Sequence, residues 1–269
     1  MQTIAAVVIT KDEERNITAC LESLKWVDEL IVVDAESSDR TVELAKAYTP
    51  KVFVRTWPGY GPQKNFAMAQ ATADWILIVD ADERVSDELR EEIVNLLRTL
   101  PSPLEGEGGG EGETPVAYQV PRRNFYYGRW VKWGGIYPDY QIRLFRRGTA
   151  RYNDVRIHEN LIVNGKIGTL NGHLDHYTEA RLDDHFTKFD LYTTLAAQEK
   201  SKSRSVVRWF DLAIRPVVTL LKTYLLNQGF RDGIRGLIIS VFASMYTFVK
   251  YAKLWELTQH ADTLSPRDR

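Results

Sequence analysis

Short apolar runs alternate with amphipathic segments along the first part of the chain. The apolar runs are rich in Val, Ile and Leu, as is typical of strands buried on both faces, and they cover residues 3–10, 30–33, 52–55 and 75–79. The segments between them repeat apolar residues at helical spacing, and they cover residues 13–24, 39–48 and 63–71. This alternation predicts an α/β fold, a parallel sheet with helices on both faces.

The pattern changes after the fourth apolar run. Ser86 can cap a helix that carries Asp87 and Glu88 in its first turn, where the helix dipole favours acidic side chains. Residues 101–115 consist mainly of Gly, Glu and Pro and have almost nothing to bury. We therefore predict a disordered insert at 101–115.

The second half of the chain contains mixed elements and then helices. Residues 116–171 are typical of strands and loops, and residues 181–200 have the spacing of an amphipathic helix. We expect this helix to pack on the domain that precedes it. The predicted division is a domain at residues 1–200 and an amphipathic helical region at residues 201–269.

The helical region combines large apolar residues with basic ones. Residues 206–226 carry Arg208, Arg215 and Lys222 among apolar side chains, and residues 236–249 are uncharged. The uncharged stretch is shorter than the ~20 residues that span a bilayer, and basic, aromatic-rich helices commonly lie in the membrane interface. We predict association with a membrane surface. A packed pair of core helices and a true span or hairpin stay open as alternatives.

The charge distribution favours an anionic partner for this region and no nucleic-acid partner for the chain. The 269 residues carry a net charge of −1, so no overall field attracts nucleic acid. Residues 204–253 hold eight Lys and Arg against two Asp, an excess of +6 that suits an anionic membrane surface. The single cysteine, Cys20, excludes an internal disulfide and fits a reducing compartment. No signal peptide is visible at the start of the sequence.

Acidic residues follow the predicted strands. Asp34 closes the second apolar run, and Asp80 and Asp82 come directly after the fourth. Because the carboxyl ends of parallel strands meet at one edge of a sheet, Thr10, Asp34 and Asp80 should converge on one crevice. Paired carboxylates are costly without a cation between them, and Mg²⁺ or Mn²⁺ suits oxygen ligands. A simple role in capping the strand is the alternative.

Several longer motifs occur along the chain in a fixed order. They are Val7–Ile17, Ile31–Thr41, Gly61–Ala67, Trp75–Glu83, Tyr137–Arg147 and Val155–Asn160. Together they resemble family 2 glycosyltransferases of the GT-A fold, and the last two are similar to the subgroup of lipopolysaccharide-core β-glucosyltransferases. The resemblance covers about residues 1–200. It implies a mostly parallel sheet flanked by helices, with the C-terminal helices as a membrane-associating appendage; the insert at 101–115 departs from the family pattern.

The resemblance also implies a donor site at the crevice. Metal ligation is expected of Asp82 and, shared with the ribose, of Asp80. The other implied nucleotide-binding residues are Thr10, Glu13, Asp34, which would hold the base, and Lys64. His158 has two interpretations: a group that completes the metal shell or steadies the diphosphate, or a packed neighbour of Glu159.

The acceptor side would follow from the later motifs. Glu159 is implied as the general base, so that Glu159 and Asp82 are the expected catalytic residues. Asp139 and Gln141 would line the acceptor, and Arg143 and Arg146 would offset phosphate charge or form structural salt bridges. For His173 and His176, a substrate or structural role is favoured over a metal-ligand role.

These features predict an inverting, metal-dependent glycosyltransferase at the cytoplasmic, inner face of the cell membrane. It would move a hexose, glucose from UDP-glucose, onto a lipopolysaccharide-core or other lipid-linked saccharide. The leaving diphosphate needs positive charge, which a metal supplies, and the acceptor hydroxyl needs a base. A polyprenyl-phosphate sugar transferase of the same fold is one alternative. A non-catalytic, membrane-recruited nucleotide-sugar-binding protein is another, although Asp80, Asp82 and Glu159 are all present.

Overall fold

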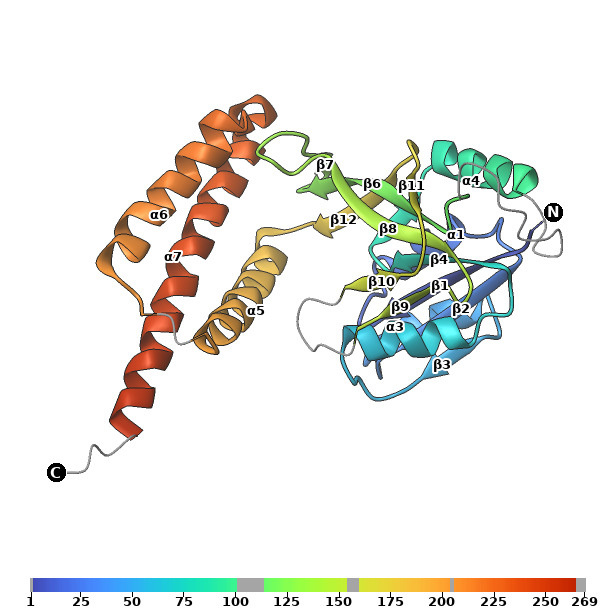
Figure 1. Cartoon of the computed structure of the whole chain (residues 1–269), viewed down its shortest axis with the longest axis horizontal. Coiled ribbons are helices and arrows are strands. Elements are labelled where there is room, and N and C mark those ends of the chain that lie inside the picture. The colour runs from blue at the N-terminus through green and yellow to red at the C-terminus, as the bar shows by residue number, and fades with distance from the viewer. Residues whose placement is uncertain (1, 101–113, 154–159, 204–205, 265–269) are drawn as a thin grey trace. The chain divides into compact units, whose positions relative to one another are not determined.

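Figure 1 shows the computed structural model of the chain, which describes residues 2–100, 114–153, 160–203 and 206–264. The chain forms two compact units, and each is treated by itself. The first unit comprises Met1–Arg123 and Asp139–His176, and the second comprises Asn124–Pro138 and Tyr177–Arg269. Most of the predicted insert at 101–115 lies outside the described residues.

The first unit begins with the predicted alternation of strands and helices. Its elements up to residue 99 are β1 (Ile4–Thr10), α1 (Ile17–Glu22), β2 (Glu29–Asp34), α2 (Thr41–Lys46), β3 (Val52–Val54), α3 (Tyr60–Ala69), β4 (Trp75–Asp80), β5 (Glu83–Val85) and α4 (Asp87–Thr99). Ser86 caps α4 as predicted, because its side chain accepts a hydrogen bond from the backbone N–H of Leu89.

The remaining strands turn the parallel core into a mixed sheet. They are β6 (Ala117–Tyr126), β7 (Arg129–Trp130), β8 (Asp139–Arg146), β9 (Ala150–Tyr152), β10 (Leu161–Val163), β11 (Ile167–Thr169) and β12 (Leu174–Glu179). The strand order is β3-β2-β1-β4-β8-β6-β12-β5, and β9 pairs with β10 separately. β1 to β4 are parallel, whereas β8 runs antiparallel to β4. The predicted α/β class is therefore confirmed.

Two apolar layers cover the two faces of this sheet. Alternate residues of β1 belong to different layers, as expected when side chains alternate along a strand: Val8 lies in one and Val7 in the other. The first layer includes α1, α2 and α4, and the second includes Ala67 and Met68 of α3. Every residue of β1 is buried, which places this strand at the centre of the core.

Cys20 belongs to the first layer. Its side chain is fully buried, and its Sγ lies 3.6 Å from the backbone oxygen of Asp80. Burial raises the pKa of this thiol well above its usual value, and the nearby carboxylates of Glu83 and Asp82 act in the same direction. The thiol is therefore a packing group and not a nucleophile.

The second unit is mainly helical. Its helices are α5 (Leu182–Ser201), α6 (Trp209–Leu221), the π-helical turn η1 (Lys222–Leu226), the 3₁₀ turn η2 (Gly229–Asp232) and α7 (Gly233–Leu264). α5 packs on α7, where Ala197 contacts Tyr251 and Leu254 in a small buried cluster. The predicted boundary at residue 200 thus falls inside this unit, at the end of α5.

Candidate active site

The carboxyl ends of three strands meet as the sequence predicted. In the β1–β2 register Thr10 lies opposite Asp34, and in the β1–β4 register Ile9 lies opposite Asp80. By the alternation of each strand, Thr10 and Asp34 face the α1 layer, while Asp80 faces the α3 layer. This edge is where ligands bind in parallel α/β sheets.

Asp80 is held between two cations. Its Oδ2 accepts a hydrogen bond from Arg143 Nη2 at 2.6 Å, and its Oδ1 lies 3.4 Å from Lys64 Nζ. Burial alone would raise the pKa of this carboxyl, but the charges of Arg143 and Lys64 outweigh it and hold the pKa well below its usual range. Asp80 is therefore a permanent anion that positions two cations at the strand end.

Glu83 extends this pair into a charge network that sequence reasoning missed. It is fully buried, and its Oε1 lies 2.6 Å from Arg143 Nη2 and 3.3 Å from Arg122 Nη1. Its Oε2 accepts a hydrogen bond from the backbone N–H of Asp80 at 3.0 Å. Arg122 in turn lies 2.6 Å from Asp139 Oδ2, so cations and anions alternate from Lys64 to Asp139.

Asp139 and Gln141 contact each other within this network. Gln141 Nε2 donates to Asp139 Oδ1 at 2.8 Å, while Arg122 binds the other carboxylate oxygen. These contacts set the orientation of Asp139. Arg146, by contrast, is not brought to this edge. It lies opposite Trp75 at the amino end of β4, ~10 Å along the strand from Arg143.

Asp82 contacts a histidine of β12. Its Oδ2 lies 3.3 Å from Nε2 of His176, which pairs with Glu83 across β5 and β12. Both side chains are largely buried, at 17% and 15% exposed. The backbone N–H of His173 donates to Ser86 Oγ. Burial and the charge of Arg123 lower the pKa of His173, so this imidazole is neutral at pH 7.

The residues expected to bind the nucleotide differ in whether their polar atoms already have hydrogen-bond partners. Asp34 is fully buried, and its two oxygens accept hydrogen bonds from the backbone N–H and hydroxyl of Ser37. Glu13 accepts a hydrogen bond from the side chain of Asn16 at 2.8 Å. Among the described residues, Thr10 Oγ1 and both polar atoms of the Gln63 side chain are buried without a partner. Such groups normally bind water or a ligand.

The two residues predicted to lie beside each other, His158 and Glu159, fall outside the described residues. The described residues on either side are well anchored. Asn65 of α3 donates to the backbone oxygen of Tyr152 and accepts from its N–H, both at 2.9 Å. Asn153 and Asn160 exchange two hydrogen bonds at 3.1 Å. The helix that carries Lys64 therefore also holds the strand that precedes residues 154–159.

Comparison with known families now decides the class of protein. The family model of glycosyl transferase family 2 matches residues 5–151, more than half of the chain. The chain belongs to glycosyl transferase family 2. It is therefore an enzyme, a glycosyltransferase, as the motifs predicted.

Two relatives match the sequence over nearly the whole chain. The lipopolysaccharide core biosynthesis glycosyltransferase LpsC of Rhizobium meliloti is 29% identical, over 94% of this chain and 92% of its own length. An uncharacterized glycosyltransferase of Rickettsia typhi, RT0209, is 31% identical over 96% of this chain and 88% of its own.

Solved structures also match the chain. TarS 1–349 of S. aureus in complex with UDP matches with a TM-score of 0.47 and 14% identity, over 96% of this chain and 92% of that one. Glucosyl-3-phosphoglycerate synthase of Mycobacterium tuberculosis, in complex with Mg²⁺ and UDP, matches with a TM-score of 0.36 and 23% identity, over 45% and 44%.

The side chains at the strand ends suit a divalent cation only if the substrate supplies further ligands. In the part of the chain that the structure describes, no three acidic, His or Cys side chains are grouped to enclose a metal. Mg²⁺ commonly needs only one or two carboxylates together with substrate phosphates. The carboxylates at this strand end are Asp80, which is neutralised by Arg143 and Lys64, and Asp82, which contacts His176.

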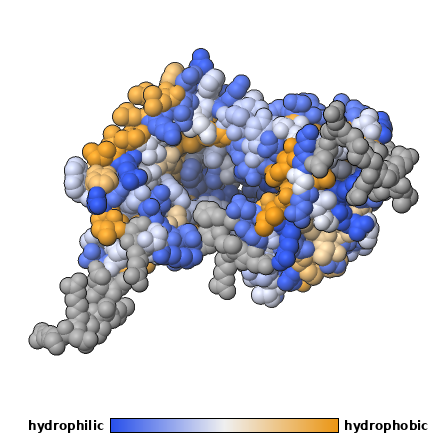
Figure 2. All heavy atoms as spheres, in the orientation of Figure 1, coloured by the Kyte–Doolittle hydropathy of each residue, from blue (hydrophilic) through white to orange (hydrophobic). Residues whose placement is uncertain are grey.

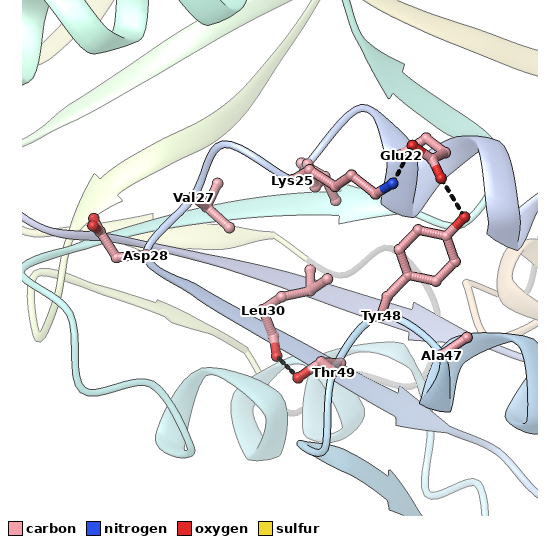
Figure 3. A pocket seen from close by; sticks show the side chains of 9 residues that line it. Glu22, Lys25, Val27, Asp28, Leu30, Ala47, Tyr48 and Thr49 are labelled. Atoms are coloured by element: carbon pink, nitrogen blue, oxygen red, sulfur yellow. Dashed lines mark hydrogen bonds and ion pairs between the residues drawn. The ribbon is translucent and has the colours of Figure 1, made fainter.

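A hollow at the opposite edge of the sheet is a different feature. Figure 3 shows its lining, which includes Glu22, Lys25, Leu30, Tyr48 and Thr49. Glu22 binds both Lys25 and the hydroxyl of Tyr48, and Thr49 donates to the backbone oxygen of Leu30. Leu30 stands near the amino end of β2, away from Asp34. The polar groups of the hollow are paired. The hollow also lies near the amino end of β2, whereas nucleotides bind at the carboxyl ends of parallel strands.

Proposed function

We propose that this glycosyltransferase transfers a hexose, glucose from UDP-glucose, with inversion onto a lipopolysaccharide-core or other lipid-linked saccharide. The observation that carries the proposal is the alternating charge network at the carboxyl edge of the parallel strands, from Lys64 through Asp80 and Arg143. The acceptor class is supported by the 29% identical relative that is named for lipopolysaccharide core biosynthesis.

The donor would bind across this edge. Thr10 and Gln63 offer buried polar atoms that lack partners among the described residues, and Asp34 and Glu13 border the same strand ends. Lys64, paired with Asp80 at 3.4 Å, and the adjacent Arg143 supply fixed positive charge for the leaving diphosphate. Groups fixed in advance stabilise developing charge without reorganising during the reaction.

Asp82, with Asp80 as a weaker second, would hold Mg²⁺ or Mn²⁺ together with the diphosphate. The cation would act as a Lewis acid on the leaving group. On the opposite side of the sugar, Glu159 is proposed as the base that takes the proton from the acceptor hydroxyl, so that a single displacement inverts the anomeric carbon. Asp139 and Gln141 are proposed to border that acceptor.

The proposed location is the cytoplasmic face of the cell membrane. Figure 2 shows hydrophobic side chains gathered over α6, where Trp209, Val217 and Leu221 are 72%, 54% and 48% exposed. One stretch, Gly229–Gln259, is also long and apolar enough to cross a membrane by length and composition. Patches of this kind mark interaction surfaces, and basic residues interspersed among them suit an anionic membrane.

Donor turnover in folded variants tests the mechanism. Asp82→Asn and Glu159→Gln should each lower kcat by about 100-fold or more, because each removes a group that acts on the reacting bond. Asp87→Asn, at an 84% exposed side chain, is the matched control and should leave the rate unchanged. Near-normal rates in both site variants would refute the mechanism. Mass spectrometry of the product separates a saccharide acceptor from a polyprenyl phosphate.

A further inference from the structure

The turn between α6 and α7 is joined to a loop from the middle of the chain. The Asp232 carboxylate accepts hydrogen bonds from the backbone N–H groups of Lys132 and Trp133, at 3.2 and 2.7 Å. The N–H of Gly134 donates to the backbone oxygen of Asn227 at 2.9 Å. We call the resulting structure, residues 129–138 with residues 222–234, the hairpin tip.

Close packing of glycines shows that the hairpin tip is a defined structure. A Cβ on Gly135, whose φ is +82°, would meet the side chain of Asn227 at 2.6 Å. A Cβ on Gly229 would meet the backbone oxygen of Thr223 at 2.8 Å. Gly135 therefore packs closely against the turn, and Gly229 allows the turn itself to pack closely.

Large apolar side chains of the hairpin tip are left in solvent. Leu226 and Ile234 are 77% and 70% exposed, and Leu225 and Phe230 are about half exposed, at 52% and 48%. Trp130 from the loop is 37% exposed. Several large exposed apolar side chains on one such structure are typical of an interaction surface.

Two cations of the hairpin tip lie on aromatic rings. The Arg231 guanidinium is 4.4 Å from the centre of the Trp133 ring, and Lys132 Nζ is 5.7 Å from that of Trp130. Within the described residues neither cation forms a salt bridge, and the neighbouring Asp232 carboxylate accepts hydrogen bonds from backbone N–H groups. Their positive charge is therefore available to an outside anion.

We propose that the hairpin tip is the part of the second unit that enters the headgroup layer of an anionic membrane. Exposed Leu and Ile would insert, the indole of Trp130 would lie at the boundary, and Lys132 and Arg231 would bind lipid phosphates. A symmetric contact with a second copy is disfavoured, because it would bring the same two cations together. This inference deepens the proposed membrane location and adds residues 129–138, which the sequence did not assign to it.

Vesicle flotation of the full-length protein tests the hairpin tip without any donor or acceptor. The double variant Lys132→Gln/Arg231→Gln should bind phosphatidylglycerol-containing vesicles about 25-fold more weakly at low salt, since each cation near an anionic surface contributes about fivefold. The charge-preserving variant Lys132→Arg/Arg231→Lys should bind normally. Leu226→Ser/Ile234→Ser should weaken binding to both neutral and anionic vesicles.

Controls distinguish this contact from its alternatives. Ile162→Ser, at a residue of the first unit that is 57% exposed, should change nothing. Full binding by both tip variants, or loss only on Met245→Asp in the middle of α7, would overturn the proposal. Light scattering provides a further test. A wild-type dimer that both tip variants dissociate would also overturn the proposal, because the hairpin tip would then bind a second copy of the chain. Glycosyl transfer to a soluble acceptor should persist in the tip variants, so this inference and the proposed function fail separately.

Discussion

Arg143 binds two carboxylates at once, and this makes it the residue on which the local charge balance depends. It is 4% exposed and contacts Asp80 and Glu83, both at 2.6 Å. Burial lowers the pKa of a guanidinium, but Asp80 and Glu83 outweigh that effect and raise the pKa of Arg143 well above its usual value. Removing one partner from a buried ionic group leaves an uncompensated charge.

We therefore expect Arg143→Met to lower the free energy of unfolding by about 3–5 kcal/mol. Urea denaturation followed by circular dichroism measures this loss. Arg40→Met, which removes a cation that is 66% exposed in a surface pair, is the matched control and should cost less than about 1 kcal/mol. Equal, small effects of the two substitutions would show that the network contributes nothing to stability.

The depressed pKa of Asp80 predicts how stability depends on pH. A carboxyl with a lowered pKa in the folded state contributes stability above its unfolded pKa of about 3.9, and that contribution is lost as the pH falls through the folded value. The stability advantage of the wild type over Asp80→Asn should be constant from about pH 7 to pH 5 and shrink below about pH 4. Urea denaturation across this range measures it, and an advantage that grew on acidification would contradict the pairing.

Some residues of the site could be predicted from the sequence, and others could not. Asp80, Lys64 and Arg143 were named from motifs, and the structure brings them together. Glu83 was missed although it directly follows the acidic motif. Its role depends on pairing with Arg122, which is distant in sequence, and local patterns carry no information on such contacts. Arg146 was expected to offset phosphate charge or to form a structural salt bridge, and the antiparallel register of β8 takes it to the other end of β4.

At the scale of elements, α3 links the donor side of the site to the strand β9. A Cβ on Gly61 would meet the backbone oxygen of Asn153 at 2.4 Å, so α3 needs a glycine at this contact. The same helix carries Lys64 and the Asn65 side chain that brackets Tyr152. The first turns of α3 therefore set the spacing between the donor side of the site and β9.

Gly61→Ala should destabilise the protein by about 1–3 kcal/mol, because the backbone of α3 or of Asn153 must shift. Replacing Gly by Ala inside a helix normally stabilises it by about 0.5–1 kcal/mol, so the sign of the change is the test. Thermal unfolding of the variant gives that sign. An increase in the melting temperature would mean that the contact with Asn153 is not a constraint.

Elements with strong patterns were predicted closely. The apolar runs gave β1, β2 and β4 to within a residue or so, and the cap at Ser86 was correct. The short strand β5 was not predicted, since three residues without apolar periodicity pair with β12 only through the tertiary fold. The expectation that residues 181–200 would pack on the preceding domain gave no hint of their contact with α7, which depends on the far end of the chain.

For the whole molecule, the proposed donor site predicts a linked dependence on nucleotide and metal. UDP with Mn²⁺ or Mg²⁺ should raise the melting temperature, because a ligand at 100 times its Kd adds about 2.7 kcal/mol of stability. The shift should be much smaller with UDP and a chelator, and smaller again in Asp82→Asn. Thermal shift assays measure all three, and an equal shift with and without metal would exclude Asp82 as its ligand.

The buried position of Cys20 allows thiol labelling to measure how often α1 separates from the sheet. The chain has one thiol, and it is sealed under the strand end that carries Asp80. An alkylating reagent can reach it only when α1 separates from the sheet, so the labelling rate of the native enzyme counts those openings. Donor bound at the strand ends should slow the labelling, and mass spectrometry would then read occupancy of the site without following any sugar.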